Sequence, residues 1–296
     1  MKKLTVFTPT FNRAFCLGQC YNSLINQTSK DFKWLIIDDG STDNTKELVS
    51  TWIHENKIEI QYQYQANQGM HGAHNTAYEL IDTELNVCID SDDYMPDNAV
   101  KLILDFWEQF GNDTVAGIVG LDGNKQGEII GTPFPNDVKN ATLINLYEKH
   151  KVTGDKKLVL RTEIVNKYPP YPLFKGERFV PLGYKYLLID QDYTLLTLNE
   201  ILCTVEYLPD GSSLNILKQY KKNPKGFAFS RIAEMQFGPT FLFRFKKAIH
   251  YVCNSLMAKN FQFLKQSPKK LLTLAALPLG IVLYFYINFK TYESKK

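Results

Sequence analysis

The strongest constraint on the fold is an alternation of short apolar runs with segments of helical periodicity. The apolar runs have the length of strands and the other segments the length of helices. In chain order, the strands are expected at 4–8, 32–37, 58–64 and 85–89, and the helices at 15–26, 42–55, 71–81 and 99–110. Strands that alternate with helices in this way are joined by crossovers and pair in parallel. The first part of the chain is therefore predicted to form a parallel α/β sheet flanked by helices.

Polar residues follow directly after each of these expected strands. In a parallel α/β sheet, ligands bind beyond the carboxyl ends of the strands. The segments that deserve inspection as a binding site are therefore 9–13, 38–41, 67–69 and 90–93.

The second expected strand ends on two carboxylates, Asp38 and Asp39, which precede a glycine and a Ser-Thr-Asp cluster. A carboxylate at this position can accept a hydrogen bond from the N–H of a uracil-type base. Ser, Thr and Asp side chains also bond backbone N–H groups, so the same residues are suited to shaping the turn and capping the next helix. The pair by itself leaves both interpretations open.

The fourth expected strand ends on Asp-Ser-Asp-Asp at 90–93, which contains a DxD pattern. Carboxylates this close repel one another, and a hard divalent cation with oxygen ligands relieves the repulsion. A cation that bridges two phosphates stabilises a leaving nucleotide as a Lewis acid. A second DxD at 190–192 has neither a preceding parallel strand nor a following helix that begins with a proline, as Pro96 is expected to do after the first pattern.

Four motifs resemble, in their order and spacing, the family 2 glycosyltransferases of the GT-A fold. They are Thr-Pro-Thr-Phe-Asn-Arg at 8–13, Asp-Asp-Gly-Ser-Thr-Asp-Asn-Thr at 38–45, Asn-Gln-Gly at 67–69 and Asp-Ser-Asp-Asp at 90–93. The resemblance is strong over these motifs and weakens after them. It implies a Rossmann-like α/β fold with a mostly parallel mixed sheet, and transfer of a sugar from a nucleotide diphosphate sugar, expected to be UDP-linked, with Mn²⁺ or Mg²⁺ as cofactor.

The resemblance also assigns roles to residues at the strand ends. Asp92 and Asp90 are the expected metal ligands, and the expected contacts of the nucleotide sugar are Pro9, Thr10, Arg13, Asp38, Asp39, Gly69, His71 and Asp90. Arg13 is equally well placed as a surface residue. Many family members have Arg or Lys after the Asn-x-Gly segment, where this chain has Met70 and then His71. His71 or His74 is expected to replace that basic group, and a place on the first turn of a helix is the alternative for either.

The general base is expected in the second half of the chain, opposite the donor. Residues 175–181, Lys-Gly-Glu-Arg-Phe-Val-Pro, resemble a Gly-Glu-x-Phe-x-Pro segment of bacterial polysaccharide members of the family. Glu177 is therefore the predicted base, which takes the acceptor proton as the hydroxyl attacks and inverts the anomeric carbon. The alternative is a surface Glu177 paired with Arg178 or a lysine. Asp155 is the second candidate, and Asp190 or Asp192 the third.

Charge divides the chain into an acidic body and a basic tail. Residues 1–210 contain 19 Lys/Arg and 29 Asp/Glu, and residues 211–296 contain 15 and 2. A basic tail attracts an anionic partner, either a membrane leaflet or a nucleic acid. Because the body is acidic and the tail includes an apolar stretch at 271–289, a membrane surface is the expected partner and no nucleic acid is expected. This stretch is long enough to cross a bilayer core as a helix, and the alternative is a break at Pro278 and Gly280 into a re-entrant or interfacial pair.

We expect a GT-A domain at 1–213, with a nucleotide-sugar half at 1–112 and an acceptor half at 113–213, and a helical membrane-associating tail at 214–296. In the acceptor half, short strands are expected at 116–121 and 128–130, and a hairpin at 193–198 and 201–207. Asp-Gly-Ser-Ser at 210–213 resembles a loop near the active site of the family, and turn chemistry explains it equally well.

The expected place of action is the cytoplasmic face of the cell membrane, where the tail is attached peripherally or by one span. Five scattered cysteines without paired CxxC motifs favour reduced thiols over disulfides or a zinc site. The expected acceptor is a glycan or lipid-linked intermediate of cell-surface polysaccharide synthesis. Three alternatives remain: a catalytically inactive GT-A binding module, a DxDxT phosphatase, which Tyr94 disfavours, and a nucleic-acid-binding protein.

Overall fold

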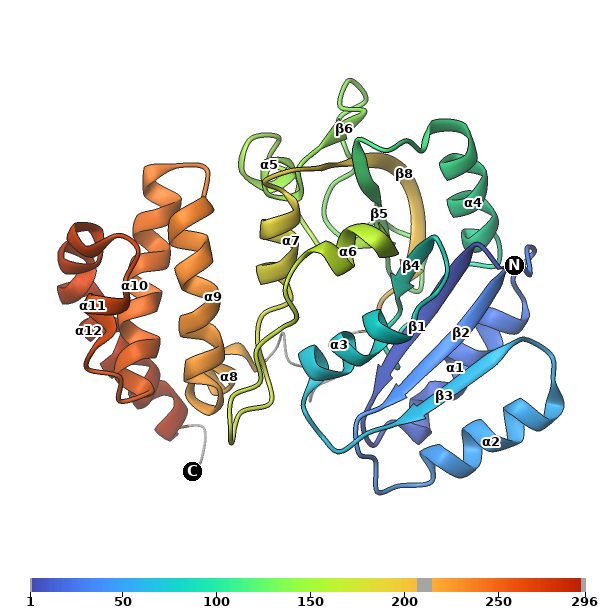
Figure 1. The fold of residues 1–296 in the computed structure, drawn as a ribbon, viewed down its shortest axis with the longest axis horizontal. Helices are drawn as coiled ribbons and strands as arrows, with labels where there is room; N and C mark the ends of the chain where they lie inside the picture. Colours follow the sequence, from blue (N-terminus) through green and yellow to red (C-terminus); the bar gives the residue numbers. More distant parts are fainter. Residues whose placement is uncertain (1, 207–214, 294–296) are drawn as a thin grey trace. The chain divides into compact units, whose positions relative to one another are not determined.

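The computed structural model describes residues 2–206 and 215–293, which form two compact units (Figure 1). The first unit groups Met1–Pro170 with Asp192–Tyr207, and the second groups Tyr171–Gln191 with Leu208–Lys296. Residues 171–191, which the sequence placed in the acceptor half, thus pack with the helical tail. The segment 210–213 and the expected boundary after residue 213 lie outside the described residues.

The first unit is built on a mixed sheet with the strand order β3-β2-β1-β4-β7-β5-β8-β6. The first four strands pair in parallel, and β7 pairs antiparallel with both β4 and β5. The strands are β1 Leu4–Thr10, β2 Phe32–Asp38, β3 Ile60–Tyr64, β4 Leu85–Cys88, β5 Val115–Gly123, β6 Asn140–Ala141, β7 Lys156–Arg161 and β8 Thr194–Thr204. The predicted α/β sheet, mostly parallel in its first half, is confirmed.

Four helices alternate with the parallel strands as the periodicity predicted. They are α1 Ala14–Ile25, α2 Thr45–Glu55, α3 Met70–Leu80 and α4 Ala99–Phe110, and the first unit also contains α5 Leu143–Glu148 and α6 Thr162–Lys167. Pro96 does not lie in the first turn of α4, as the sequence suggested. The helix begins at Ala99 after Asn98, and the Pro96 carbonyl accepts a hydrogen bond from the Ala99 nitrogen at 2.9 Å.

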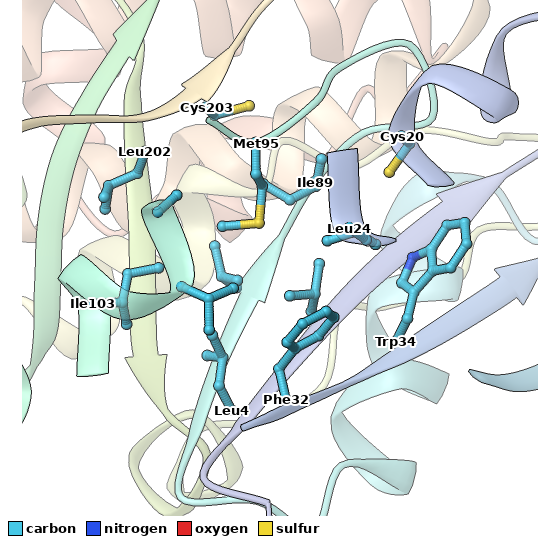
Figure 2. Packing of buried hydrophobic residues seen from close by; sticks show 14 of the residues in the cluster. Leu4, Cys20, Leu24, Phe32, Trp34, Ile89, Met95, Ile103, Leu202 and Cys203 are labelled. Carbon is cyan, nitrogen blue, oxygen red and sulfur yellow. The ribbon is translucent and has the colours of Figure 1, made fainter. Parts of the chain in front are cut away.

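Side chains alternate along each strand, so successive residues lie on opposite faces of the sheet. Different helices cover the two faces. Leu4 of β1 and Phe32 and Trp34 of β2 belong to one buried cluster with residues of α1, α2 and α4, several of which Figure 2 shows. On the opposite face, the Phe7 ring packs edge-on against His74 and Tyr78 of α3, at centroid distances of 5.1 and 5.6 Å. Each fully buried side chain of this kind contributes about 1.5–3 kcal/mol, so both faces of β1 fix its position.

The expected hairpin at 193–207 is wrong, because β8 is one strand. It pairs in parallel with β5, and the register shifts so that Thr197 lies opposite Val119 and Ile201 opposite Leu121. Asn199 lies in this irregular stretch, and its side chain accepts from the Phe134 nitrogen at 2.8 Å and donates to the Phe134 carbonyl at 2.9 Å. The polar pair Asn199-Glu200 therefore marks a bulge rather than a turn. Residues 128–130 form an isolated bridge, Gly123 with Ile129, rather than a strand.

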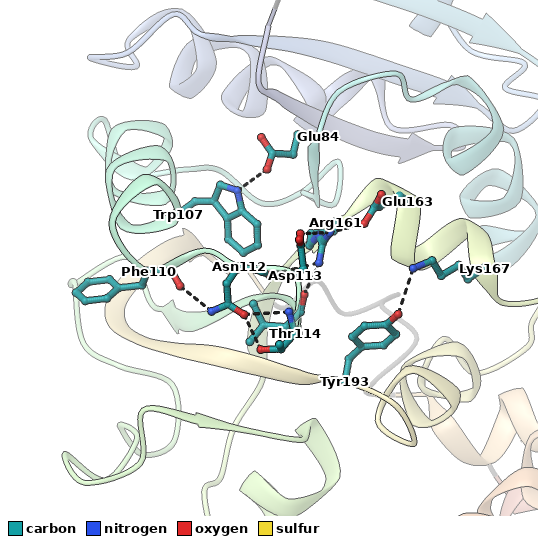
Figure 3. Close-up of polar contacts among 11 residues, drawn as sticks. Glu84, Trp107, Phe110, Asn112, Asp113, Thr114, Arg161, Glu163, Lys167 and Tyr193 are labelled. Carbon is teal, nitrogen blue, oxygen red and sulfur yellow. Dashed lines mark hydrogen bonds and ion pairs between the residues drawn. The ribbon is translucent and has the colours of Figure 1, made fainter.

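Arg161 joins the end of β7 to the start of β5 and to the loop before it, and Figure 3 shows part of this contact. Its guanidinium donates to the carbonyls of Asn112 and Val115, at 3.3 and 3.2 Å, and forms ion pairs with Asp113 and Glu163. Because β7 is the antiparallel strand between β4 and β5, these contacts help to join the two halves of the sheet.

The second unit is helical, as expected for the tail. Its helices are α7 Gly183–Ile189, α8 Ile216–Lys222, α9 Pro224–Phe237, α10 Phe241–Met257, α11 Phe263–Gln266 and α12 Lys270–Glu293. Of the two alternatives for 271–289, the structure has the continuous helix and not the break at Pro278 and Gly280, because α12 continues through both residues. Within the described residues, α12 is the helix that is long and apolar enough to cross a membrane.

Candidate active site

The ends of β1 and β2 lie side by side, which brings two of the predicted motifs together. Thr10 pairs with Asp38 in the parallel register, and the Asp39 nitrogen donates to the Thr10 carbonyl at 2.8 Å. Pro9 is the next residue along β1 and pairs with Ile37. The motif residues Pro9, Thr10, Asp38 and Asp39 thus lie at one edge of the sheet.

Asp39 organises the loop that follows β3. Its Oδ1 accepts from the Gln65 side chain at 2.7 Å and from the Gln68 nitrogen at 2.8 Å, and its Oδ2 accepts from the Gly69 nitrogen at 2.7 Å. Gly40 has a φ of +88°, and a Cβ there would lie 2.9 Å from the Asn67 nitrogen. A glycine is needed at this position for both reasons. The Asp-Asp-Gly and Asn-Gln-Gly motifs are therefore parts of one structure.

Asp38 is fully buried and shapes the turn after β2. Its Oδ1 accepts from the Ser41 nitrogen at 2.7 Å and its Oδ2 from the Tyr62 hydroxyl at 2.6 Å. Burial and this hydrogen bond to the Asp38 carboxylate raise the pKa of Tyr62. Asp38 and Asp39 therefore both make the contacts that a turn-shaping role requires. Contact of either residue with a nucleotide base stays a prediction.

Asn12, which the sequence interpretation did not single out, ties the loop after β1 to the loop after β2. Its backbone has a φ of +53°, its nitrogen donates to the Ser41 hydroxyl at 2.9 Å, and its Oδ1 accepts from the Thr42 nitrogen at 2.7 Å. An asparagine tolerates this left-handed conformation better than most residues. The neighbouring Arg13 lies just before α1, where its guanidinium lies 5.6 Å from the centroid of the exposed Phe15 ring.

The three acids after β4 differ in exposure. Asp90 is exposed, Asp92 is half-buried, and Asp93 is buried. The backbone of this acid loop, residues 90–93, is held by a bond from the Gln19 side chain to the Asp92 carbonyl at 2.5 Å and by one from the Asp93 nitrogen to the Asp90 carbonyl at 3.0 Å. The two acids predicted to bind a metal are therefore the two with access to solvent.

Asp90 and Asp92 are suited to a cation that takes some of its ligands from the protein and the others from a substrate. Among the described residues, no group of three or more His, Cys, Asp or Glu side chains is arranged to hold a metal ion. Mg²⁺ commonly takes one or two carboxylates and completes its shell with water and substrate phosphates. Asp90 and Asp92 fit that pattern. A structural metal site, in contrast, takes all of its ligands from the protein.

A largely enclosed cation, Lys157 of β7, lies within the electrostatic reach of Asp90 and Asp93 of the acid loop. Its side chain is 12% exposed, and its Nζ lies 3.8 Å from the Oδ1 of Asp122, which is buried. Burial lowers the pKa of Lys157, but the charges of Asp122, Asp93 and Asp90 outweigh burial and hold it well above its ordinary value. Burial also raises the pKa of Asp93, to about 7, against the opposing charge of Lys157. Nothing in the sequence pattern marked Lys157 or Asp122.

The two histidines of α3 are both buried. His74 packs edge-on against Phe7 and Tyr78, at 5.1 and 5.7 Å between ring centroids. His71 lies in the first turn of α3, which begins directly after Gly69. His74 is thus packed inside the protein as a helix residue, which was the alternative to a phosphate contact. Contact of His71 with the donor phosphates stays a prediction.

Glu177 lies in the second unit, where its buried carboxylate binds the N-terminus of α9. Its Oε1 accepts from the Lys225 nitrogen at 3.0 Å and its Oε2 from the Gly226 nitrogen at 2.9 Å. These are among the N–H groups that a helix start leaves unsatisfied. A Cβ at Gly226 would lie 2.1 Å from the Phe179 carbonyl oxygen, so the chain passes very close to the helix here. The alternative of a surface Glu177 paired with a basic residue does not describe this contact.

The other candidate bases lie in different surroundings. Asp155 is exposed on the turn before β7. Asp192 is also exposed and accepts a hydrogen bond from the Tyr168 hydroxyl at 2.6 Å. Asp190 is the C-cap residue of α7, in the second unit.

Comparison with known proteins agrees with the motifs. Residues 5–167 match the family model described as glycosyl transferase family 2. GalNAc(5)-diNAcBac-PP-undecaprenol beta-1,3-glucosyltransferase of Campylobacter jejuni is 30% identical over 144 residues, which are 46% of this chain and 45% of that protein. The chain spans less than half the length of the first curated relatives that it matches.

Two solved structures share the fold at low sequence identity. S. aureus TarS 1-349 in complex with UDP-GlcNAc has a TM-score of 0.62 at 16% identity, over 94% of this chain and 80% of that one. The mannosyltransferase PcManGT from Pyrobaculum calidifontis, in complex with GDP-Man and Mn²⁺, has a TM-score of 0.58 at 13% identity, over 96% and 87%. With the family match extending over more than half of its length, the chain belongs to glycosyl transferase family 2 and has the GT-A fold.

Proposed function

We propose that this chain is an inverting, metal-dependent glycosyltransferase that takes a sugar from a UDP-linked donor. The observation that supports this most is the acid loop, whose two accessible acids follow β4, beside the end of β1. The S. aureus structure with the same fold contains UDP-GlcNAc, and the Pyrobaculum structure contains GDP-Man with Mn²⁺. Family membership makes this chemistry the first to test.

In this proposal the nucleotide binds at the edge formed by Pro9, Thr10 and Asp39. The loops at this edge are already ordered by internal hydrogen bonds. Asp39 holds the Gly69 nitrogen at 2.7 Å and Asn12 holds the Thr42 nitrogen at 2.7 Å, so little loop entropy is lost when a donor binds. Arg13 and His71 are the proposed contacts of the donor phosphates.

Asp90 and Asp92 would hold Mn²⁺ or Mg²⁺ against the diphosphate. When bound, such a cation offsets the negative charge that develops on the leaving nucleotide. Asp93 acts indirectly, since its Oδ1 accepts from the Glu206 nitrogen at 3.1 Å and so fixes the loop that presents the other two acids.

Glu177 stays our proposed base, with a second role in anchoring α9. A carboxylate has about four acceptor positions, so two N–H bonds leave room for an acceptor hydroxyl. The base takes the hydroxyl proton while the oxygen attacks the anomeric carbon from the face opposite the nucleotide, which inverts that centre. Asp155 is the alternative if Glu177 serves only as an anchor.

We further propose a glycan or lipid-linked acceptor of bacterial cell-surface polysaccharide synthesis, reached at the cytoplasmic face of the membrane. The name of the Campylobacter relative specifies a transfer to an undecaprenol-linked glycan. The basic composition of residues 211–296 and the apolar helix α12 support a membrane location.

The decisive experiment measures hydrolysis of a panel of nucleotide sugars with Mn²⁺, with Mg²⁺ and with chelator, because hydrolysis requires no knowledge of the acceptor. Asp92→Asn is expected to lower the metal-dependent rate by about a hundredfold or more. Asp97→Asn, an exposed acid just after the loop, is the matched control and should retain the rate. Metal-independent activity, or full activity of Asp92→Asn, contradicts the proposal.

A catalytically inactive GT-A module is the second candidate, favoured by the internal use of the Asp39 and Glu177 carboxylates. It predicts calorimetric binding of a uridine diphosphate sugar with no hydrolysis and no transfer under any metal condition. The same panel therefore distinguishes the two functions.

A further inference from the structure

One side of α12 is fixed to its neighbours in the second unit. The residues on this stripe recur at helical spacing and are buried: Thr273, Ala276, Gly280, Ile287 and Thr291. At Gly280 a Cβ would lie 2.5 Å from the Val252 side chain of α10, so the two helices are in close contact there. At the other end, the Lys221 Nζ of α8 donates to the Thr291 hydroxyl at 3.3 Å. The helix is thus attached to the unit along its length.

The opposite side of α12 is apolar and exposed. Leu271, Val282 and Phe285 are 84%, 64% and 65% exposed, and Leu274, Leu279 and Phe289 lie on the same side. Single exposed apolar residues are ordinary on a protein surface, but a continuous apolar face of this kind indicates an interaction site.

The charged residues in α12 and directly before it are three lysines and one acid, Glu293, the last residue of the helix, so their sum is positive. Lys269 directly precedes the helix, Lys270 is its first residue, Lys290 lies near its end, and all three are exposed. Residues 211–296 contain 15 Lys/Arg and 2 Asp/Glu, and one of those acids, Glu234, is paired internally with Arg231 and Lys247. An anionic surface complements such a face, whereas a second copy of the same face repels it.

The packing of α12 also decides how it would meet a bilayer. A span across the membrane would take its packing partner α10 along, with Arg244, Lys246 and Lys247 on that helix. Charged side chains in the hydrocarbon core are strongly unfavourable. A helix that lies in the plane of the interface, with its apolar side in the acyl region and the lysines at the headgroups, avoids this cost.

We propose that α12 docks the chain on an anionic lipid surface by lying flat in one leaflet, without spanning the bilayer. The docking proposal specifies how the chain reaches the membrane location that is part of the proposed function. It rests on the proposed function only for the statement that the acceptor is reached at the membrane. The docking itself follows from the second unit alone.

Flotation of the full chain with vesicles tests the proposal. Vesicles of phosphatidylcholine and phosphatidylglycerol in equal amounts should bind the chain, and vesicles of phosphatidylcholine alone should bind it about tenfold less. The double variant Val282→Glu/Phe285→Glu should lose about tenfold in binding or more. Phe110→Glu, an exposed apolar residue of the first unit, is the matched control and should bind as the wild type.

Three results would overturn the proposal. Retention of the wild-type chain in vesicles after alkaline carbonate extraction would indicate a span. Equal binding to neutral and anionic vesicles would remove the role of the lysines. Sedimentation that shows a dimer abolished by the double variant, with no lipid binding by the wild type, would identify a second copy as the occupant of the face.

The docking test is independent of the proposed activity. Nucleotide-sugar hydrolysis in solution should be unchanged in the double variant, because neither position belongs to the proposed site. Loss of flotation with hydrolysis retained supports docking by α12. If the wild-type chain floats with vesicles but hydrolyses no nucleotide sugar, the transferase proposal is contradicted and the docking proposal is supported.

Discussion

The carboxylate of Asp93 accepts a hydrogen bond from the backbone nitrogen of Glu206, 3.1 Å away and 113 positions later in the chain. The residues beside them are also paired, since Tyr94 and Thr204 exchange two backbone hydrogen bonds of 3.1 and 2.7 Å. The acid loop after β4 is therefore fixed by the end of β8, a strand from the part of the chain expected to recognise the acceptor.

This relationship predicts that Asp93 matters for the acid loop without binding the metal itself. Asp93→Ala leaves the partly buried Glu206 N–H without its acceptor, which is expected to lower the free energy of unfolding by about 1 kcal/mol. It should also raise the Mn²⁺ concentration needed for half-maximal hydrolysis. Asp93→Asn keeps an acceptor oxygen, so it should lose less of both. Equal effects of the two substitutions would show that the charge, and not the hydrogen bond, is what matters.

Lys157 is expected to contribute to stability because it forms an ion pair with the buried Asp122. Lys157→Met leaves the buried Asp122 carboxylate without its ion partner, and we expect the free energy of unfolding, measured with urea, to fall by about 3 kcal/mol. Adding Asp122→Asn should recover much of this loss. Lys101→Met breaks an exposed pair with Asp105 and, as the control, should cost about 0.5 kcal/mol or less. Additive losses in the double variant would contradict the coupling.

Glu177 has two proposed roles that a pair of substitutions separates. Glu177→Gln preserves one oxygen acceptor at the start of α9 but cannot take a proton. If Glu177 is the base, this variant should keep its thermal stability within a few degrees and lose transfer by about a hundredfold or more. Glu177→Ala should lose both stability and transfer. Substantial transfer by Glu177→Gln would assign Glu177 to the anchor alone and direct attention to Asp155→Asn.

Acid should weaken the second unit through His250. Burial, followed by the charges of Arg231 and Lys247 and against that of Glu234, lowers its pKa from 6.5 to about 4, and the Tyr220 ring lies 5.8 Å away. Between these pH values the unfolded chain binds a proton that the folded chain does not. The free energy of unfolding should therefore fall as the pH falls, by up to about 1.4 kcal/mol per pH unit.

His250→Asn tests this dependence by urea unfolding from neutral pH to pH 4. The variant should show a shallower loss of stability than the wild type. His54→Asn replaces an exposed histidine and is the control, which should follow the wild type. Parallel curves for the wild type and His250→Asn would exclude His250 as the source of the acid sensitivity.

Local sequence was sufficient for the parallel half of the sheet, and the place of the site stays a prediction made from it. Strands and helices of this half are set by the period of apolar residues, and a site at the carboxyl edge follows from parallel pairing. The Asp-Asp-Gly and Asn-Gln-Gly motifs were recognised separately. Their junction required the three-dimensional contact between Asp39 and Gly69, which are 30 positions apart.

Tertiary structure decided the features that depend on partners distant in sequence. Nothing near Lys157 in the sequence distinguishes a largely enclosed lysine from a surface one, because its environment is made by Asp122 and the acid loop. Asn199 looked like a turn residue until its bonds with Phe134 showed a bulge in β8. Glu177 had no visible partner in its own segment, since its partners are backbone nitrogens at 225 and 226. Periodicity and turn chemistry are local properties that a sequence displays directly, whereas burial, charge pairing and helix anchoring exist only once remote segments have packed.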